Sequence, residues 1–403
     1  MNAIFIGLLR EGKNPPDKRV ALSPEQCKRL MKQHPHLSIY CQPSHARCFA
    51  DSEYASAGVY IQEDLSHCDY LMGIKEIPID QLLATKTYLF FSHTIKQQPH
   101  NRDLLKAVLA KKITLIDYEC LTNQEGQRLV AFGKFAGIVG AYNAILTYTK
   151  RHPIFDLKRA YRCFDINELQ KEFSKVKLPP IKIVVTGSGK VAGGVKMVLD
   201  GMCIHQVSPS DFLEKNYSYP VYTLLRSADY HESIDGSVFS SNVFHHYPDR
   251  FKSTFLRYAQ TADILIAAAY WNPKAPLLFT KEDMKKTDFT IKIIADITCD
   301  INGSIPSTQR VSRIDDPWYD YNPITEKIED AFSKESNISV MAIDNLPCEL
   351  PRDSSISFGE QLIESVIPDM LLDKKPSSTL LRATIATEGK LTKLFSYLED
   401  FVK

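Results

Sequence analysis

The sequence predicts an α/β protein with two domains, each built on a mostly parallel, twisted sheet, and a ligand cleft between them. Short apolar segments of strand length alternate with amphipathic segments of helix length. A polar, charge-mixed connector ends at Pro179-Pro180, which is typical of a domain boundary. At 403 residues the chain is long enough for two hydrophobic cores.

The composition narrows the function classes. A hydrophobic content of 44% with 24% charged residues is typical of a globular protein, and a net charge of +1 argues against nucleic acid or an acidic membrane as partner. No apolar run approaches the ~20 residues of a membrane span. Arg10 and Glu11 interrupt the first apolar segment, so no signal peptide is predicted. The nine cysteines are dispersed without a C-x-x-C pair, which predicts reduced thiols, no metal site and a cytoplasmic location.

The first element is a strand at 4–9 that runs into a charged loop. A helix follows from Ser23, with Pro24 at its first position and Gln26 at the spacing of a capping box. The loop between them carries Arg10, Glu11, Lys13, Lys18 and Arg19. Charges just beyond the carboxyl end of a first strand lie where open α/β sheets bind ligands.

Further strands alternate with helical patterns in the first third of the chain, which predicts parallel pairing with right-handed crossovers. These strands are predicted at 37–41, 70–74, 88–92 and 113–118.

Two ionisable residues, Lys75 and His93, each close one of these strands. A buried lysine needs a partner, and Glu76 and Glu119 are candidates. A single histidine at a strand end is more often structural than catalytic. The pair beside the Arg19 loop favours a catalytic role.

Arg128 and Phe132 precede a glycine-rich helix predicted at about 137–151, which would lead out of the first domain. A guanidinium group is suited to hold a carboxylate. The glycines at 133, 137 and 140 are spaced by four and three, so we interpret them as a close helix contact.

A strand at 181–185 runs into Gly187, Gly189, Gly193 and Gly194 and then into an apolar helical stretch. Because a strand precedes the glycines and a helix follows them, the pattern predicts the phosphate-binding turn of a dinucleotide fold. The first glycine would make the tight turn and the second would let the pyrophosphate approach the backbone.

The coenzyme preference between NAD and NADP stays open. An acidic residue after the next strand would bind the ribose 2′-hydroxyl of NAD, but the segment there offers Ser208 and Ser210, with Asp211 slightly late. Arg226 could instead pair with the 2′-phosphate of NADP.

Three more strands are predicted at 264–269, 292–296 and 339–343, each ending in a polar turn. The insertion at 227–260 contains His245 and His246, and adjacent histidines point in different directions, which argues against a metal site. Helices are predicted at 358–371 and at the end of the chain.

The segments GLLREGK, GIKEIP, FFSHTIK, LIDYE, RLVAFGKFAG, TGSGKV, AYWNP and IDNLP follow one another in this order. The chain thereby resembles the alanine dehydrogenase, transhydrogenase and saccharopine dehydrogenase superfamily. It is most similar to the lysine-forming saccharopine dehydrogenases and to the lysine–ketoglutarate reductase half of aminoadipic semialdehyde synthase.

The resemblance implies two Rossmann-like domains. Residues 1–136 would form the substrate domain and 137–346 the NAD(P)-binding domain, while 347–403 would pack back on the first. It implies reversible conversion of saccharopine, NAD(P)+ and water to lysine, 2-oxoglutarate and NAD(P)H, with small-molecule partners only and a monomer or small homo-oligomer.

The family's functional residues carry over to this sequence. The catalytic pair falls on Lys75 and His93. Substrate contacts fall on Arg19, Arg128 and Phe132, and we add Glu119 as a candidate. Coenzyme contacts fall on the loop of Gly187, Ser188, Gly189, Lys190 and Val191, on Tyr270, and on Asp344, Asn345 and Leu346. Ser208 and Arg226 are our own further candidates at the ribose. Ala192 replaces a cysteine of the fungal members, so their disulfide is not expected, and Ser208 stands near their NAD-selecting aspartate.

Two other functions remain open. An alanine dehydrogenase-like enzyme would share the Arg, Lys and His pattern, but the SHTIK and IDNLP motifs favour saccharopine chemistry. A catalytically silent NAD(P)-binding regulator is the third possibility, and the presence of both Lys75 and His93 argues against it.

Overall fold

The computed structural model describes residues 3–12, 17–371 and 377–403, so Lys13 of the predicted charged loop lies outside the described residues. The chain divides into two compact units. The first contains residues 1–132 and 351–403, and the second contains residues 133–350.

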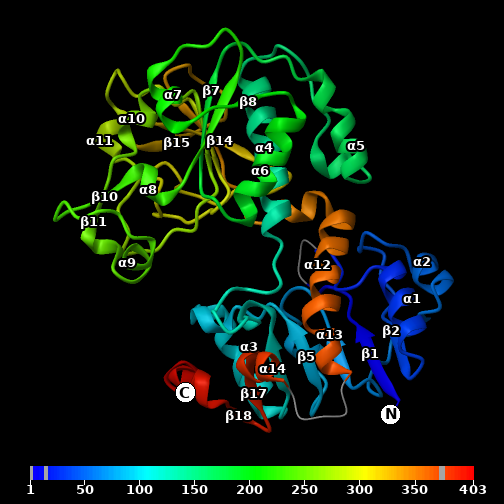
Figure 1. Cartoon of the computed structure of the whole chain (residues 1–403). Coiled ribbons are helices and arrows are strands. Elements are labelled where there is room, and N and C mark those ends of the chain that lie inside the picture. The colour runs from blue at the N-terminus through cyan, green and yellow to red at the C-terminus, as the bar shows by residue number, and fades with distance from the viewer. Residues whose placement is uncertain (1–2, 13–16, 372–376) are drawn as a thin grey trace. The chain divides into compact units, whose positions relative to one another are not determined.

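The first unit contains an eight-stranded sheet with the order β18-β17-β6-β5-β4-β1-β2-β3 (Figure 1). Six strands run parallel, whereas β17 pairs antiparallel with β6 and with β18. The strands are β1 (Ile4–Leu8), β2 (Leu37–Cys41), β3 (Tyr60–Ile61), β4 (Tyr70–Met72), β5 (Thr87–Phe90), β6 (Thr114–Asp117), β17 (Thr384–Thr387) and β18 (Lys390–Leu391).

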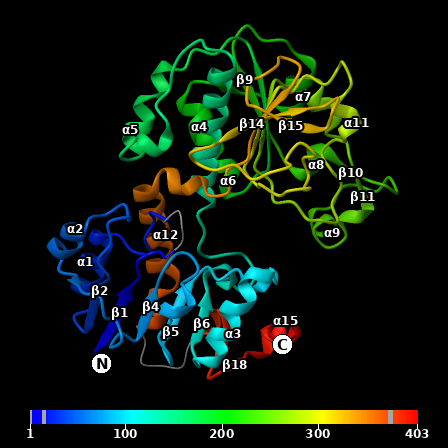
Figure 2. The same cartoon turned by 180° about the vertical axis from the view of Figure 1, so that it is seen from behind.

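Helices cover both faces of this sheet. Leu89 of β5 packs in one core with Leu30 of α1 and Phe358 of α12, while its neighbour Tyr88 packs in another core with Leu105 of α3. This alternation is expected for a strand that is buried on both faces. Figures 1 and 2 show α12 beside the strands of the N-terminal segment. The helices are α1 (Pro24–Gln33), α2 (Asp51–Ser56), α3 (Arg102–Ala110), α12 (Pro351–Ser365), α13 (Ile367–Met370), α14 (Ser378–Ala383) and α15 (Glu399–Val402).

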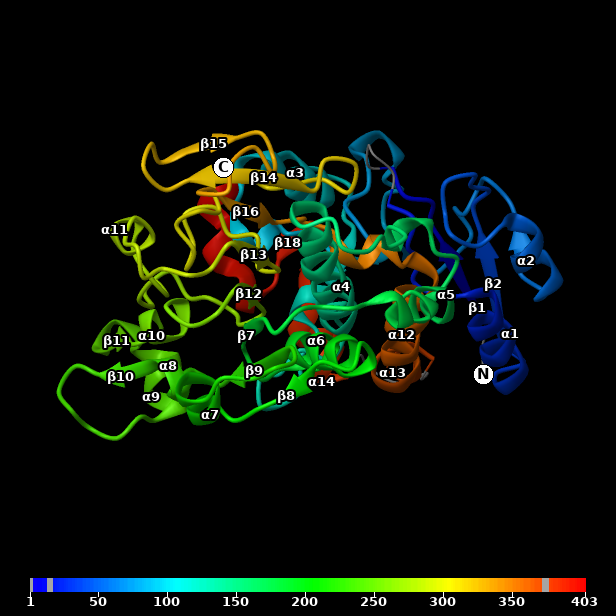
Figure 3. The ribbon, with the colours of Figure 1, turned by 90° about the horizontal axis from the view of Figure 1, so that it is seen from above.

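The second unit contains an eight-stranded sheet with the order β15-β14-β16-β13-β12-β7-β9-β8, which can be followed from top to bottom in Figure 3. Only β14 and β15 at one edge break the parallel pairing. The strands are β7 (Lys182–Thr186), β8 (His205–Gln206), β9 (Val221–Leu225), β12 (Ile264–Ala267), β13 (Ile293–Asp296), β14 (Trp318–Asn322), β15 (Lys327–Glu329) and β16 (Ile338–Met341).

A long helix, α4 (Gly133–Arg151), packs with α6 (Lys190–Gly201) in the core of this unit. A separate hairpin of β10 (His231–Ser233) and β11 (Phe251–Ser253) encloses α9 (Ser241–His246). The remaining helices are α5 (Ile166–Lys171), α7 (Pro209–Glu214), α8 (Ser227–Tyr230), α10 (Leu256–Ala259) and α11 (Lys281–Met284).

The predicted α/β class with two mostly parallel sheets is confirmed. The capping box is also present: Ser23 Oγ accepts from the backbone N–H of Gln26, and Gln26 Oε1 accepts from that of Ser23. The predicted strands form with their ends shifted by at most two residues.

Two helix starts were predicted wrongly. The helix α4 begins at Gly133 rather than 137 because its first turn packs against α6 of the second unit. The helix α12 begins at Pro351 rather than 358, so its first turn belongs to the first unit. The units therefore separate at 132/133 and 350/351, four residues from the boundaries expected at 136/137 and 346/347.

Glycines make the contact between α4 and α6 possible. A Cβ at Gly137 would lie 1.9 Å from the carbonyl oxygen of Val191, and one at Gly194 would lie 2.1 Å from that of Lys134. Because the obstructing atoms belong to the backbone, no side-chain rotation could relieve either clash. The interpretation of the glycines as a helix contact is thus supported at Gly137.

The substitution Gly194→Ala should destabilise the second unit by about 1–3 kcal/mol, since the two helices would have to separate. Gly193→Ala is the matched control, because a Cβ there meets no atom within 4 Å. The control should be neutral or gain up to about 1 kcal/mol from helix propensity. Urea unfolding of both variants measures the difference, and equal stabilities would contradict the close contact.

Candidate active site and dinucleotide site

The first candidate site lies at the carboxyl edge of the first sheet. The strand order changes direction between β1 and β4, which is the position where open α/β sheets bind ligands. The loop after β1 carries Glu11, the loop after β4 carries Lys75 and Glu76, and the loop after β5 carries His93. The parallel fold therefore brings together residues that are far apart in the sequence.

Glu11 ties two of these loops together. Its Oε1 accepts from the backbone N–H of Ile74 at 2.6 Å, and its Oε2 accepts from that of Lys75 at 2.9 Å. Burial, reinforced by the neighbouring Asp17 carboxylate, raises the pKa of Glu11 to about 8. The sequence marked Glu11 only as a charge in the loop and gave no signal that it holds the backbone of Lys75.

His93 and Glu76 form a hydrogen-bonded pair through Nδ1 and Oε1. Burial alone would raise the pKa of Glu76, but the hydrogen bond and charge of His93 lower it to about 2, and the Lys75 charge adds to this effect. A carboxylate only accepts, so Nδ1 of His93 carries the proton. The pairing with Glu76 therefore leaves Nε2 as the other ring nitrogen of His93 that could exchange a proton.

The His93 backbone has φ of 52°, a left-handed conformation that is unusual for a residue other than glycine. Asp117 holds the preceding residue in place. Its Oδ2 accepts from the backbone N–H of Ser92 at 2.9 Å and from Ser92 Oγ at 2.5 Å, and its Oδ1 accepts from the backbone N–H of Glu119 at 2.7 Å. A fully buried carboxylate thus positions the loops that carry both His93 and Glu119.

Arg19 lies between a carboxylate and an aromatic ring. Its side chain is 4% exposed and is paired with Asp17 at 2.6 Å, and its guanidinium lies 4.1 Å from the centre of the Phe132 ring. Phe132 in turn stacks on Phe358 with ring centres 4.4 Å apart. The structure thus brings the predicted substrate residues Arg19 and Phe132 into contact. It also shows Asp17 as the ion-pair partner of Arg19, which the sequence did not indicate.

The other two predicted substrate residues also form a pair. Arg128 Nη2 lies 2.6 Å from Glu119 Oε1, and Lys96 Nζ lies 3.6 Å from the same oxygen. The Arg128 side chain is 39% exposed, so its guanidinium remains accessible to a ligand.

Glu11 generates a pH-dependent prediction. Between its ordinary pKa of 4.5 and its folded value of about 8, the folded chain holds a proton that the unfolded chain has released. Stability should therefore fall as the pH rises through this range, by about 2–4 kcal/mol relative to Glu11→Gln. Urea-unfolding free energies at pH 5 and pH 8 measure this slope.

Glu125→Gln serves as the control for this measurement, because Glu125 is an exposed carboxylate of the same unit. It should leave the slope unchanged. If the difference between wild type and Glu11→Gln were the same at both pH values, the raised pKa would be wrong.

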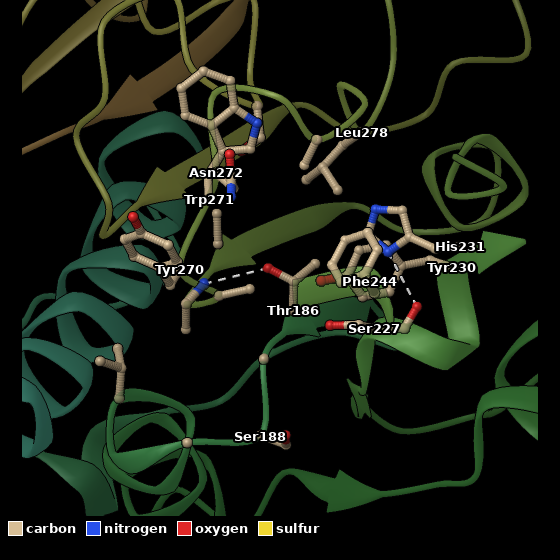
Figure 4. Close-up of a pocket in the computed structure, with 18 of the residues that line it drawn as sticks. Thr186, Ser188, Ser227, Tyr230, His231, Phe244, Tyr270, Trp271, Asn272 and Leu278 are labelled. Carbon is tan, nitrogen blue, oxygen red and sulfur yellow. Dashed lines mark hydrogen bonds between the residues drawn. The ribbon is translucent and has the colours of Figure 1, made fainter. Parts of the chain in front are cut away.

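The second candidate site is a cavity of about 420 Å³ in the second unit, shown in Figure 4. It lies where the strand order changes direction, between β7 and β12. Its lining includes 186–191 at the end of β7, 267–272 at the end of β12, and three residues after β9, namely Ser227, Tyr230 and His231. Phe244 and His245 of α9 and Ala275, Pro276 and Leu278 also line it.

The glycine loop fits a phosphate. Gly187 has φ of +106°, and a Cβ there would lie 2.8 Å from the carbonyl oxygen of Ala268. A Cβ at Gly189 would meet no atom within 4 Å, so this residue faces open space. The backbone of the loop leads into the N-terminus of α6 at Lys190, which favours an anion.

Tyr270 is 87% exposed and lines the cavity together with the glycine loop. Asp344, Asn345 and Leu346 are not among its lining residues. They follow β16, which is three strands away from β7. Burial chiefly raises the pKa of Cys299, and the charges of Asp296 and then Asp344 add to this effect, so Asp344 lies near the end of β13.

A short strand does form before Ser208, but it does not lie beside the glycine-loop strand as predicted. The short β8 lies at the edge of the sheet, and β9 takes the position next to β7. Ser208 instead caps α7, since its Oγ accepts from the backbone N–H of Asp211. The residue directly after β9 is Arg226, so a cation stands where the expected acidic residue would lie.

Sequence reasoning left the insertion at 227–260 without a function. In the structure, Tyr230, His231, Phe244 and His245 of this segment line the cavity. No group of three or more His, Cys, Asp or Glu that could hold a metal ion occurs in the described part of the chain. Within the same described residues, no helix is both long enough and apolar enough to cross a membrane.

Comparisons with known proteins agree with this architecture. Residues 7–139 match the family described as alanine dehydrogenase/PNT, N-terminal domain. Over 98% of its length the chain is 31% identical to alpha-aminoadipic semialdehyde synthase of Arabidopsis thaliana. Over 89% it is 25% identical to the saccharopine dehydrogenase [NAD(+), L-lysine-forming] of Emericella nidulans, of which it covers 90%. The chain is a homologue of these proteins.

The chain spans 41% of the length of the Arabidopsis relative. A solved L-alanine dehydrogenase superposes with a TM-score of 0.65 at 15% identity, covering 99% of this chain and all of the other. That similarity shows the fold alone. The resemblance that the sequence motifs predicted is therefore confirmed.

Proposed function

We propose that this protein is an NAD(P)-dependent oxidoreductase that interconverts saccharopine with lysine and 2-oxoglutarate. One observation carries the proposal. Lys75 and the His93–Glu76 pair lie at one sheet edge in the unit that also holds Arg19 and Arg128, and the other unit holds a phosphate-type loop beside a cavity. The names of the homologous saccharopine dehydrogenases, which include NAD(+) and L-lysine-forming, support this assignment.

In this proposal residues of the first unit bind the substrate. Arg19 is buried beside Asp17, so it is held in place before any ligand arrives, whereas Arg128 is partly exposed and pairs with the Glu119 carboxylate and the Glu119 backbone. Both guanidinium groups are suited to carboxylates, and saccharopine carries three. The arginines would orient the substrate so that its secondary amine faces the acid–base groups.

Lys75 would act as the base that removes the proton from the secondary amine. When bound, the nicotinamide ring supplies hydride acceptance or donation. His93 Nε2 would activate the water that hydrolyses the resulting imine, because Glu76 holds the Nδ1 proton and stabilises the imidazolium. Asp117 and Glu11 would keep these two groups in place through the loop backbones.

The glycine loop of the second unit would hold the coenzyme's pyrophosphate. This fit rests on the chain itself: Gly187 adopts a turn that a side chain would obstruct, and Gly189 leaves open the space that a phosphate needs. Ser188, Lys190 and Val191 complete the loop, and Tyr270 lies across the cavity from it. We further propose that Asp344, Asn345 and Leu346 contact the coenzyme at a point outside this cavity.

Arg226 supports NADP as the preferred coenzyme. Arg226→Gln should weaken NADPH binding by about 10–100-fold, because a charge-assisted contact to the 2′-phosphate is lost, and should change NADH binding by less than about 3-fold. Neither arginine is among the residues that line the cavity. Arg250→Gln is a suitable control, since Arg250 is also exposed but does not follow the strand beside the glycine-loop strand. Dissociation constants measured by coenzyme fluorescence would contradict the assignment if NADPH and NADH were affected equally.

Lys75→Met should lower turnover by at least about 100-fold, the amount expected for loss of an acid–base group, while coenzyme affinity stays within about 3-fold. The pH profile of turnover should lose the limb that belongs to the lysine. Steady-state rates and coenzyme titrations test both statements. A loss of NADPH affinity as large as the loss of rate would contradict the role.

The overall proposal is tested by supplying purified protein with NADPH or NADH, an oxo acid and an amine. Lysine with 2-oxoglutarate should be the productive pair. Pyruvate lacks the distal carboxylate and should lower kcat/KM by about two to four orders of magnitude, because a charge-assisted contact between that carboxylate and a guanidinium would be lost. Better turnover with pyruvate and ammonia would make the protein an alanine dehydrogenase-like enzyme, and no turnover with coenzyme binding would make it a regulator.

The cytoplasmic location and a monomeric or small homo-oligomeric state remain predictions. Cell fractionation and light scattering of the purified protein would test them.

A further inference from the structure

We propose that the excursion between β9 and β12 reads the adenine base of the coenzyme, with His231 as the hydrogen-bond acceptor for the base's exocyclic amine. The excursion comprises residues 227–253, which contain α8, β10, α9 and β11. This inference rests on the proposed coenzyme binding and adds which part of the coenzyme these residues recognise.

The position of the excursion selects the adenosine half of a dinucleotide. In doubly wound folds the residue at the end of the strand beside the glycine-loop strand contacts the adenosine ribose. Here that strand is β9, and Ser227, Tyr230 and His231 follow it directly and line the cavity. The cavity volume of about 420 Å³ is within the range of small-molecule sites.

The excursion lines its side of the cavity with aromatic rings that pack against one another. The ring of Phe244 lies 4.4 Å from His231 and 5.2 Å from Phe251, centre to centre, and His231 lies 4.4 Å from Tyr230. Ser253 Oγ of β11 donates to the Leu278 carbonyl at 2.9 Å, which ties the excursion to another part of the cavity lining. An aromatic face opposite an apolar side chain such as Leu278 suits a flat base.

The hydrogen bond of His231 determines its tautomer. Nδ1 lies 3.1 Å from the carbonyl oxygen of Ser227, and a carbonyl only accepts, so Nδ1 carries the proton. Burial lowers the pKa of His231 to about 4, although the Ser227 hydrogen bond opposes this shift, so the ring is neutral at neutral pH.

Nε2 of His231 is therefore an acceptor. None of the hydrogen bonds among the described residues uses it. Figure 4 shows this nitrogen on the side of the ring away from Ser227. Adenine presents an amino group that donates, whereas hypoxanthine presents an oxygen at the same position, which would face the lone pair of Nε2.

The test compares NADPH with its hypoxanthine analogue, and NADH with its own, by titration of the full-length protein without amino-acid substrate. The hypoxanthine forms should bind about 10–100-fold more weakly, the cost of leaving a buried acceptor unsatisfied. Equal affinities within about twofold would overturn the role of His231. This wild-type comparison needs no variant and so does not depend on whether a variant folds.

His231→Phe keeps a ring between Tyr230 and Phe244 but removes the acceptor. In this variant the ratio of the affinity for the adenine coenzyme to the affinity for its hypoxanthine analogue should fall below about 3. His246→Phe is the matched control, because His246 belongs to the same segment, is exposed and does not line the cavity. It should keep the wild-type ratio. A folded His231→Phe protein that also kept the ratio would overturn the proposal.

Phe244→Ala tests the stacking wall separately. It should weaken adenine and hypoxanthine forms alike, by about 5–50-fold, because both bases have the same flat face. Val243→Ala on the same helix is the control, since Val243 does not line the cavity. An unchanged affinity in Phe244→Ala would place the base elsewhere.

The outcomes separate this inference from the proposed function. Binding without discrimination between the bases overturns the inference alone. Discrimination without turnover of lysine and 2-oxoglutarate supports the inference and rejects the reaction. No binding of any dinucleotide rejects both.

Discussion

Parallel strands end at the same edge of their sheet, and the candidate chemistry of this protein depends on that constraint. In the first unit it brings Glu11, Lys75 and His93 to one edge, although they come from three separate strands. In the second unit it brings the glycine loop, Arg226 and Tyr270 to the edge around the strand-order change. Helices on both faces bury most of the strand residues in apolar cores, and the loops at these edges carry the candidate polar groups.

Concentrating charge at a sheet edge requires each group to have a partner. Arg19 has Asp17, Glu76 has His93, and Arg128 and Lys96 share Glu119. Asp117 and Glu11 instead accept hydrogen bonds from backbone N–H groups, so these buried carboxylates fix the conformation of the loops. Such an arrangement is preorganised, because the loops are held in the absence of a ligand.

The cavity of the second unit differs in character. Its glycine loop offers backbone groups, while the excursion after β9 adds aromatic rings and one neutral histidine. A plain crossover from β9 to β12 would need only a single helix. The hairpin of β10 and β11 with α9 therefore adds an aromatic side to the cavity that a dinucleotide-binding fold does not require.

The sequence by itself determined the features that depend on local pattern. Apolar runs located the strands, the serine and glutamine at 23 and 26 formed the capping box, and the strand–glycine–helix order located the loop at Gly187. It also predicted Lys75 and His93 as site residues, because ionisable residues at strand ends are visible without a structure, and Arg19 and Arg128 as groups that could hold a carboxylate.

Only the tertiary structure decided the features that depend on strand order and side-chain partners. The short strand β8 precedes β9 in the sequence, yet it is β9 that pairs with the glycine-loop strand β7. Arg226 rather than Ser208 therefore follows the strand beside the glycine loop. Glu11 was visible only as a charge in a loop, and Asp117 and His231 gave no signal in the sequence. The role proposed for each depends on a hydrogen bond to a backbone N–H or carbonyl within 3.1 Å, and these bonds form only after folding.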